Sequence, residues 1–193
     1  MGAKQHTLAK TVSLSGVGLH TGVSASITFH PADENHGIAF KRTDLPDSQP
    51  IPALVENVID TSRSTKIGKD GASVQTIEHV MATLYSLGID NALLEVSGPE
   101  VPIMDGSARD FLNVLLEAGS KEQEAEREVF VIDEPVHYIE KDRRVELAAL
   151  PAEDFNAAVM IDFDSDVLNP QHASIHNLED FSEQIADSRT FCF

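Results

Sequence analysis

The stretch SVQTIEHVMATLYSLGIDNALLEVSG, residues 73–98, decides the fold because it is typical of a helix followed by a buried strand. Its first half repeats apolar side chains at helical spacing, with Ser73 as a candidate cap and Gly88 as the stop. Its second half, DNALLEVSG, is rich in residue types that are typical of a buried strand. A helix followed directly by a buried strand predicts helices layered on a sheet, as in an α+β fold.

The residues on either side extend this pattern. We expect strands in HTLAKTVSLSG (6–16), VSASITFHP (23–31) and GIAFKR (37–42), and a bent strand in IPALVENVID (51–60). Downstream, SARDFLNVLLEAG (107–119) predicts a second helix closed by its final glycine. The charged residues around 120–128 predict a linker.

Beyond this linker the sequence predicts a second set of elements. Strands are expected in residues 129–151 and 155–163, and a helix is expected to start in NLEDFSEQIADSRTF (177–191). We therefore predict two α+β units, 1–124 and 125–193. The second unit is expected to be incomplete, because one helix is too little to cover its sheet.

The charge distribution limits the possible partners. The chain carries a formal net charge of -18, which disfavours nucleic acid as a partner. Residues 1–120 hold 14 acidic and 8 basic residues, whereas residues 121–193 hold 18 and 6. The first part is thus better able to bind an anionic small molecule, for which Lys41, Arg42, Arg63 and Lys66 are candidates.

The sequence also predicts a location. Cys192 is the single cysteine, so no internal disulfide is possible and a reducing compartment is expected. No apolar run is long enough to span a bilayer, and the first residues lack the apolar core of a signal peptide. We therefore predict a cytoplasmic protein without a transmembrane segment.

The predicted first helix carries an adjacent carboxylate and imidazole, Glu78 and His79. One side of its helical wheel is apolar and predicts the core face: Val74, Ile77, Val80, Met81, Leu84 and Leu87. His79 falls on the opposite side, among the small or polar residues Gln75, Ala82, Thr83 and Ser86. Such a face allows close approach by a ligand, and the pattern leaves two interpretations open: a partly exposed helix histidine, or a cleft that holds a ligand. The HExxH zinc motif is absent.

Three further segments offer polar groups. QHASIH places His172 and His176 four residues apart, which would suit either a metal pair or two exposed histidines. PEVPIMDGSARDF contains Asp105, which by itself is typical of a turn before a helix. ADSRTFCF offers the hydroxyl of Thr190 and the flat faces of Phe191 and Phe193.

Together these segments resemble one family. The blocks SGVGLHTG, RTDL, IDTSRSTKI, TIEHVMATLYSLGIDNALLEVSGPEVPIMDGSA and SRTFCF resemble, in order and spacing, the zinc-dependent UDP-3-O-acyl-N-acetylglucosamine deacetylase of lipid A biosynthesis. The resemblance implies two α+β units with the active site between them. It also implies removal of acetate from the sugar amide of UDP-3-O-(3-hydroxyacyl)-N-acetylglucosamine with Zn²⁺ as cofactor.

The resemblance further implies roles for individual residues. His79 matches a zinc ligand and Glu78 the general base that activates the zinc-bound water. Thr190 matches a hydroxyl that helps to hold the oxyanion. Asp105 matches an acid that does not bind the metal itself but belongs to the layer of residues around the ligands. Phe163 and Phe191 match aromatics of the sugar–nucleotide region; Arg63 joins them as a candidate for substrate binding. No catalytic role follows for His20.

The sequence departs from the family pattern in one respect. The family's other two zinc ligands, a His and an Asp in a motif resembling H-K-x-x-D, and a further His are not among these 193 residues. We therefore expect the N-terminal part of the enzyme, with a C-terminal continuation or a fused hydroxyacyl-carrier dehydratase as possible additions. This chain alone is expected to bind zinc weakly and to deacetylate poorly. A non-catalytic binding module of the same fold, and a metal-binding protein that uses His172 and His176, are the alternatives.

Overall fold

The computed structural model describes residues 3–190 and contains two compact units. One unit is formed by Met1–Arg127 together with Phe181–Phe193, and the other by Glu128–Asp180. Sheets with few helices confirm the α+β class. The two similar domains expected at 1–124 and 125–193, with a site between them, stay a prediction, because compact units alone do not show that arrangement.

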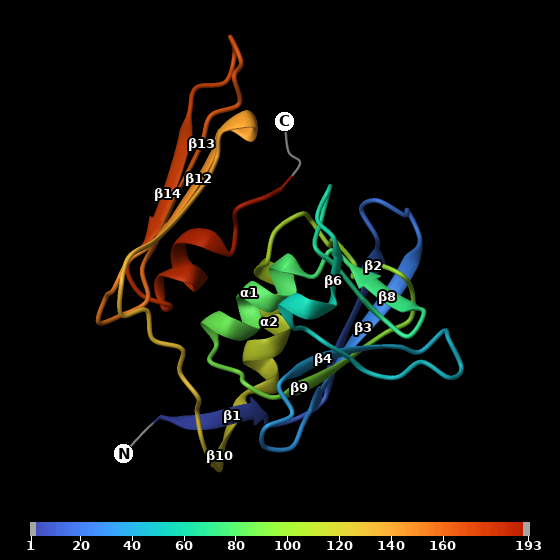
Figure 1. Cartoon of the computed structure of the whole chain (residues 1–193). Coiled ribbons are helices and arrows are strands. Elements are labelled where there is room, and N and C mark those ends of the chain that lie inside the picture. The colour runs from blue at the N-terminus through green and yellow to red at the C-terminus, as the bar shows by residue number, and fades with distance from the viewer. Residues whose placement is uncertain (1–2, 191–193) are drawn as a thin grey trace. The chain divides into compact units, whose positions relative to one another are not determined.

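The first unit contains three sheets and two α-helices within its described residues (Figure 1). Its strands are β1 (Lys4–Leu8), β2 (Val12–Val17), β3 (Ser24–Pro31), β4 (Ile38–Arg42), β5 (Ile51–Pro52), β6 (Val58–Asp60), β7 (Lys66–Lys69), β8 (Ala72–Gln75), β9 (Ala92–Val96) and β10 (Ser120–Glu126). Its helical elements are η1 (Val55–Asn57), α1 (Glu78–Ser86), α2 (Arg109–Ala118) and the short π-turn η3 (Phe181–Ile185).

The central sheet has the strand order β2-β3-β9-β4-β5, with β9 antiparallel to β3 and parallel to β4. Helices α1 and α2 share one apolar core with this sheet. Phe29 of β3 meets Phe111 of α2 edge to face, with ring centroids 6.5 Å apart. Leu84 of α1 and Leu94 of β9 are fully buried in the same core. The expected strands in 23–31, 37–42 and 90–98 and the second helix are therefore confirmed.

The predicted start of the first helix at Ser73 is wrong. Residues 72–75 form β8, and α1 begins only at Glu78, after the left-handed Thr76 (φ 62°). Val74 is buried, but as a residue of β8 and not as part of the helix. The helical wheel also misplaced Thr83, which is fully buried and whose hydroxyl donates to the His79 carbonyl at 2.7 Å.

Three further expectations need correction. The single strand expected over 6–16 is two strands, and the first of them, β1, pairs with β10. β10 occupies the stretch expected to be a linker, since a charged strand at a sheet edge can leave its acidic side chains in solvent. The helix expected near the end of the chain is reduced to η3. The bend expected in 51–60 is the turn η1.

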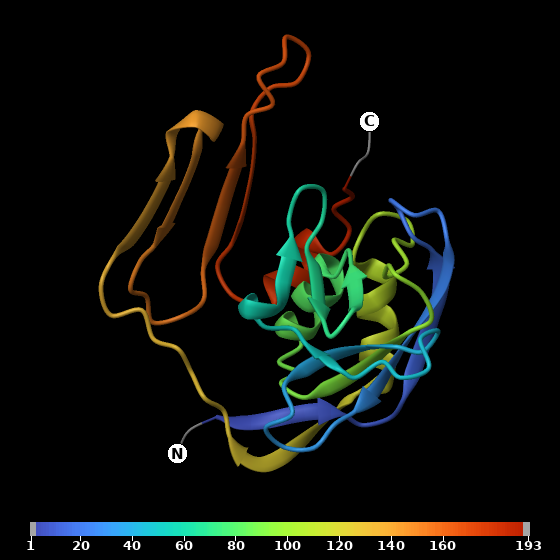
Figure 2. The ribbon, with the colours of Figure 1, turned by 45° about the vertical axis from the view of Figure 1, so that its right-hand side comes forward.

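The second unit consists of two antiparallel hairpins within its described residues (Figure 2). The first joins β11 (Val136–Glu140) to β12 (Val145–Ala149) through the turn η2 (Lys141–Arg143), and the second joins β13 (Ala157–Ile161) to β14 (Gln171–Ile175). Within residues 3–190 we find no helix with the length and apolar character needed to cross a membrane.

Candidate functional site

A cavity of about 250 Å³ lies where α1 begins. Its walls come from separate segments of the first unit: Leu19, His20, Arg63, Ser64, Thr76, Glu78, His79, Ile103 and Thr190. Four of the residues singled out in the sequence, Arg63, Glu78, His79 and Thr190, therefore meet in one place. His20 joins them, although the sequence supplied no catalytic role for it.

Glu78 is placed in the first turn of α1, where a negative charge interacts favourably with the helix dipole. Its carboxylate accepts a hydrogen bond from the backbone N–H of Thr65. Thr65 in turn accepts a hydrogen bond from the N–H of Thr76 at 3.1 Å. These contacts hold the carboxylate at the cavity wall, while the residue as a whole stays exposed to solvent. Glu78 is thus oriented and accessible to a water molecule.

His79 is half-buried beside it. Its ring nitrogen Nδ1 is buried and has no hydrogen-bond partner in the part of the chain that the structure describes. A buried polar atom without a partner costs about 1–3 kcal/mol, so a ligand that binds such a nitrogen gains part of that free energy. A metal ion fits this donor. Residues 3–190 contain no group of three His, Cys, Asp or Glu side chains that could complete such a site.

Thr190 is held at the cavity by the loop before α2. Its N–H donates to the carbonyl of Gly106 at 2.9 Å, and the neighbouring Arg189 pairs with Asp105 at 3.0 Å. Asp105 also accepts hydrogen bonds from the backbone and hydroxyl of Ser107. The hydrogen bonds from Ser107 hold the pKa of the Asp105 carboxyl below its ordinary value, and Arg189 lowers it further by a smaller amount. Asp105 does not line the cavity, and its expected role as a supporting acid stays a prediction.

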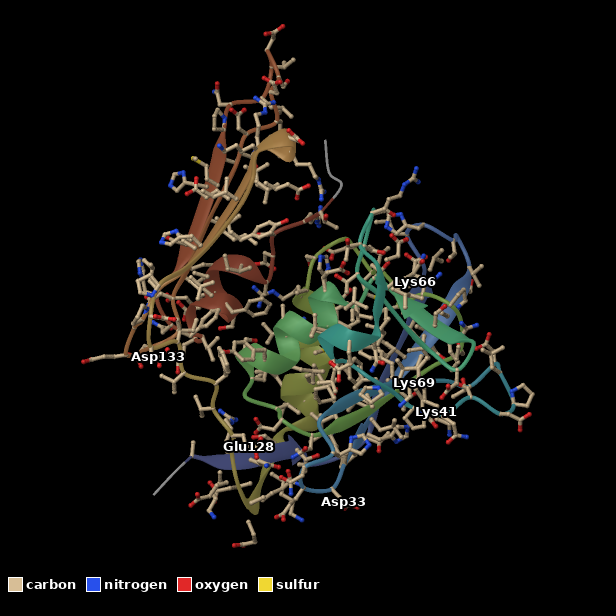
Figure 3. The ribbon with its side chains drawn as sticks, viewed as in Figure 1. Asp33, Lys41, Lys66, Lys69, Glu128 and Asp133 are labelled. Atoms are coloured by element: carbon tan, nitrogen blue, oxygen red, sulfur yellow. The ribbon has the colours of Figure 1, made fainter. Side chains whose placement is uncertain are left out.

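The basic residues of the first unit differ in their pairing. Lys41 and Arg42 donate to acidic side chains at 3.4 and 2.7 Å, so their charges are already matched. Lys66 lies at the start of β7 (Figure 3). Arg63 lines the cavity and forms no ion pair with any residue in the range 3–190. Of the four candidates, Arg63 is therefore best placed to meet an anion in this cavity.

The remaining candidates lie elsewhere. Phe163 belongs to the unit Glu128–Asp180 and is exposed there, and Phe191 lies outside the described residues. His172 is on β14 and His176 follows it; both are exposed. The roles expected for these residues stay predictions.

Sequence reasoning missed two features of the site. His20 reaches the cavity from the turn after β2, and Glu100 lies behind that turn with 1% of its surface exposed. The only signal for Glu100 is an acidic residue inside the run VSGPEVP, whose neighbours are mostly of buried or turn-forming types.

Comparison with known proteins gives consistent matches. The family model for UDP-3-O-acyl N-acetylglycosamine deacetylase matches residues 5–193. UDP-3-O-acyl-N-acetylglucosamine deacetylase of Myxococcus xanthus is 46% identical over 190 residues, covering 98% of this chain and 60% of the relative. The bifunctional enzyme LpxC/FabZ of Chlorobaculum tepidum is 44% identical over 190 residues, covering 98% of this chain and 41% of the relative. The chain thus spans about half the length of the curated relatives it matches.

Proposed function

Because the chain belongs to the UDP-3-O-acyl N-acetylglycosamine deacetylase family, we propose that it provides the general base and one zinc ligand of a lipid A biosynthetic deacetylase. The substrate is UDP-3-O-(3-hydroxyacyl)-N-acetylglucosamine, and the products are acetate and the free amine. The observation that carries this proposal is the cavity in which Glu78, His79, Arg63 and Thr190 meet.

The chemistry assigned to these side chains follows from their types and positions. Hydrolysis of an amide needs a base to take a proton from the attacking water and a donor to stabilise the developing oxyanion. The Glu78 carboxylate, oriented by the Thr65 N–H and open to solvent, suits the first task. The Thr190 hydroxyl lies on the same cavity and suits the second. Arg63 suits the diphosphate of the substrate, because its guanidinium presents several donors to an anion.

Zinc fits this cavity as a partial site. His79 supplies one donor, with a buried ring nitrogen that lacks a partner among the described residues. When bound, zinc would polarise the carbonyl and lower the pKa of a coordinated water to about 7. A catalytic zinc site uses three protein ligands as a rule, so we propose that the other ligands come from outside these 193 residues. The weak zinc affinity and weak activity of this chain alone belong to the same proposal, as does its cytoplasmic location.

Zinc titration tests the assignment of the metal ligand. We expect the wild-type chain to bind zinc weakly, the His79→Ala variant to lose that binding, and a His172→Ala/His176→Ala double variant to retain it. The double variant is the matched control because its histidines lie on the exposed hairpin. Loss of binding in the double variant alone would favour the exposed pair as the metal site. Tight stoichiometric zinc together with robust deacetylation by this chain would contradict the partial site.

A non-catalytic binding module is the second candidate, favoured by the lack of a three-ligand group within residues 3–190. It predicts that the chain binds the UDP-sugar without metal and that Arg63→Ala weakens this binding. Calorimetry with and without a chelator distinguishes the deacetylase from the binding module, because removal of zinc should not change the affinity of a non-catalytic module for the UDP-sugar. A fused dehydratase, which the resemblance raised beside a C-terminal continuation, stays a prediction.

A further inference from the structure

Glu100 is a buried carboxylate to which the proposed reaction assigns no task. It follows β9 in the segment between Pro99 and Pro102 and exposes only 1% of its surface. Burial of a carboxylate is costly unless hydrogen bonds replace the water it loses. Glu100 forms no ion pair with any residue in the described part of the chain. Within the described residues, its negative charge is therefore stabilised by hydrogen bonds and not by an ion pair.

Those hydrogen bonds come from two walls of the cavity. From the turn after β2, the His20 N–H donates to Oε1 at 3.0 Å, and the N–H and hydroxyl of Thr21 donate to Oε2 at 2.8 and 2.7 Å. From the segment before α1, the Thr76 hydroxyl donates to Oε1 at 2.8 Å. Burial raises the pKa of Glu100, but these hydrogen bonds outweigh it and hold the pKa below its ordinary value. The group is an anion enclosed by donors.

Both walls are shaped around this carboxylate. A Cβ on Gly18 would lie 2.4 Å from Oε2, so the turn approaches Glu100 as closely as only glycine permits. Thr76 is in the left-handed region with φ 62°, which is a strained conformation for a β-branched residue. Its hydrogen bond to Glu100 offsets part of that strain. Two residues later the chain reaches Glu78, and His79 follows.

We propose that Glu100 is a positioning residue that fixes the His20 turn on one wall and the Thr76 corner, with Glu78 and His79, on the other. The importance of Glu100 for catalysis rests on the proposed function, whereas its effect on the positions of His20 and His79 does not. When Glu100 is neutral, it keeps one carbonyl acceptor, but its other polar atom presents an O–H or N–H to the converging donors, so part of the hydrogen bonds that join the two walls is lost. The turn and the corner then separate, and the cavity loses its fixed width.

Histidine-ring NMR spectra of the 193-residue chain test this inference. Glu100→Gln should shift the ring signals of His20 and His79 and should speed amide exchange of His20 and Thr21 by about tenfold or more. Glu95→Gln is the matched control, because Glu95 contacts the ring of His30 at 3.2 Å on the same stretch of chain. It should shift His30 and leave His20 and His79 at their wild-type positions.

Two narrower variants cover the case in which Glu100→Gln fails to fold. Thr21→Val removes one hydroxyl donor from the turn and should shift mainly His20, whereas Thr76→Val should shift mainly His79. Unchanged His20 and His79 signals in a folded Glu100→Gln chain, or in both threonine variants, would overturn the inference. The spectra need neither zinc nor substrate, so a failure of the proposed deacetylase function leaves their outcome intact.

Discussion

Replacement of Gly18 by alanine should destabilise the protein more than replacement of Gly22, although only Gly22 has a positive φ. Gly22 has φ 66° and no atom within 4 Å of the point that an added Cβ would occupy, so alanine there costs only the left-handed strain of about 1–2 kcal/mol. At Gly18 the new Cβ would lie 2.4 Å from Glu100 Oε2 and 2.6 Å from Thr21 Oγ1. Neither atom can move freely, because the two are hydrogen-bonded to each other.

The size of the Gly18→Ala effect follows from what must move. Relief of the overlap displaces either the carboxylate or the turn and breaks at least one hydrogen bond to a charged group, worth about 1.5–3 kcal/mol. Overpacking of a filled site adds about 1–3 kcal/mol. We therefore expect a loss of about 2.5–6 kcal/mol in the free energy of unfolding, measured by urea denaturation. An equal or larger loss for Gly22→Ala would refute the reasoning that contact with Glu100, rather than backbone conformation, governs this turn.

Two other predictions concern pH and the segment that carries Thr190. Because the folded-state pKa of Glu100 is lowered from 4.5, its contribution to stability is complete above that pH and is lost as the pH falls through the folded value. Urea midpoints between about pH 6 and 3 should therefore fall more steeply for the wild type than for Glu100→Gln, and parallel curves would contradict this. Arg109 of α2 pairs with Asp187 at 2.6 Å and donates to the Ser182 carbonyl at 2.9 Å. Arg109→Ala should thus speed amide exchange in 181–190, whereas Arg144→Ala, which removes an exposed pair in the other unit, should not.

The strands and the second helix were predictable because their signals are local. β3 and β9 show alternating or continuous apolar residues, and α2 ends at a glycine in the left-handed region. The start of α1 was placed too early because Val74 lies three residues before Ile77, which is a helical spacing, although Val74 belongs to β8. β10 was missed for a different reason: its partner, β1, lies more than 110 residues away, and no local signal reports that pairing.

The candidate site was also predictable in one part and not in another. Glu78 and His79 were predicted as base and ligand through the family resemblance, and the structure brings Arg63 and Thr190 to the same cavity as these two residues. Glu100 could not be found, because a lone acidic residue is ordinarily exposed and its burial depends on donors 24 and about 80 residues away.

The interruption of the first unit by residues 128–180 has a consequence for synthesis on the ribosome. The central sheet and both helices are complete once β10 has emerged, but Thr190 enters the cavity wall only after about 60 further residues. At about 5–20 residues per second, that delay lasts roughly 3–12 seconds. During this interval the nascent chain carries Glu78 and His79 in a cavity whose wall still lacks Thr190. The wall of the cavity is therefore completed in an order set by translation.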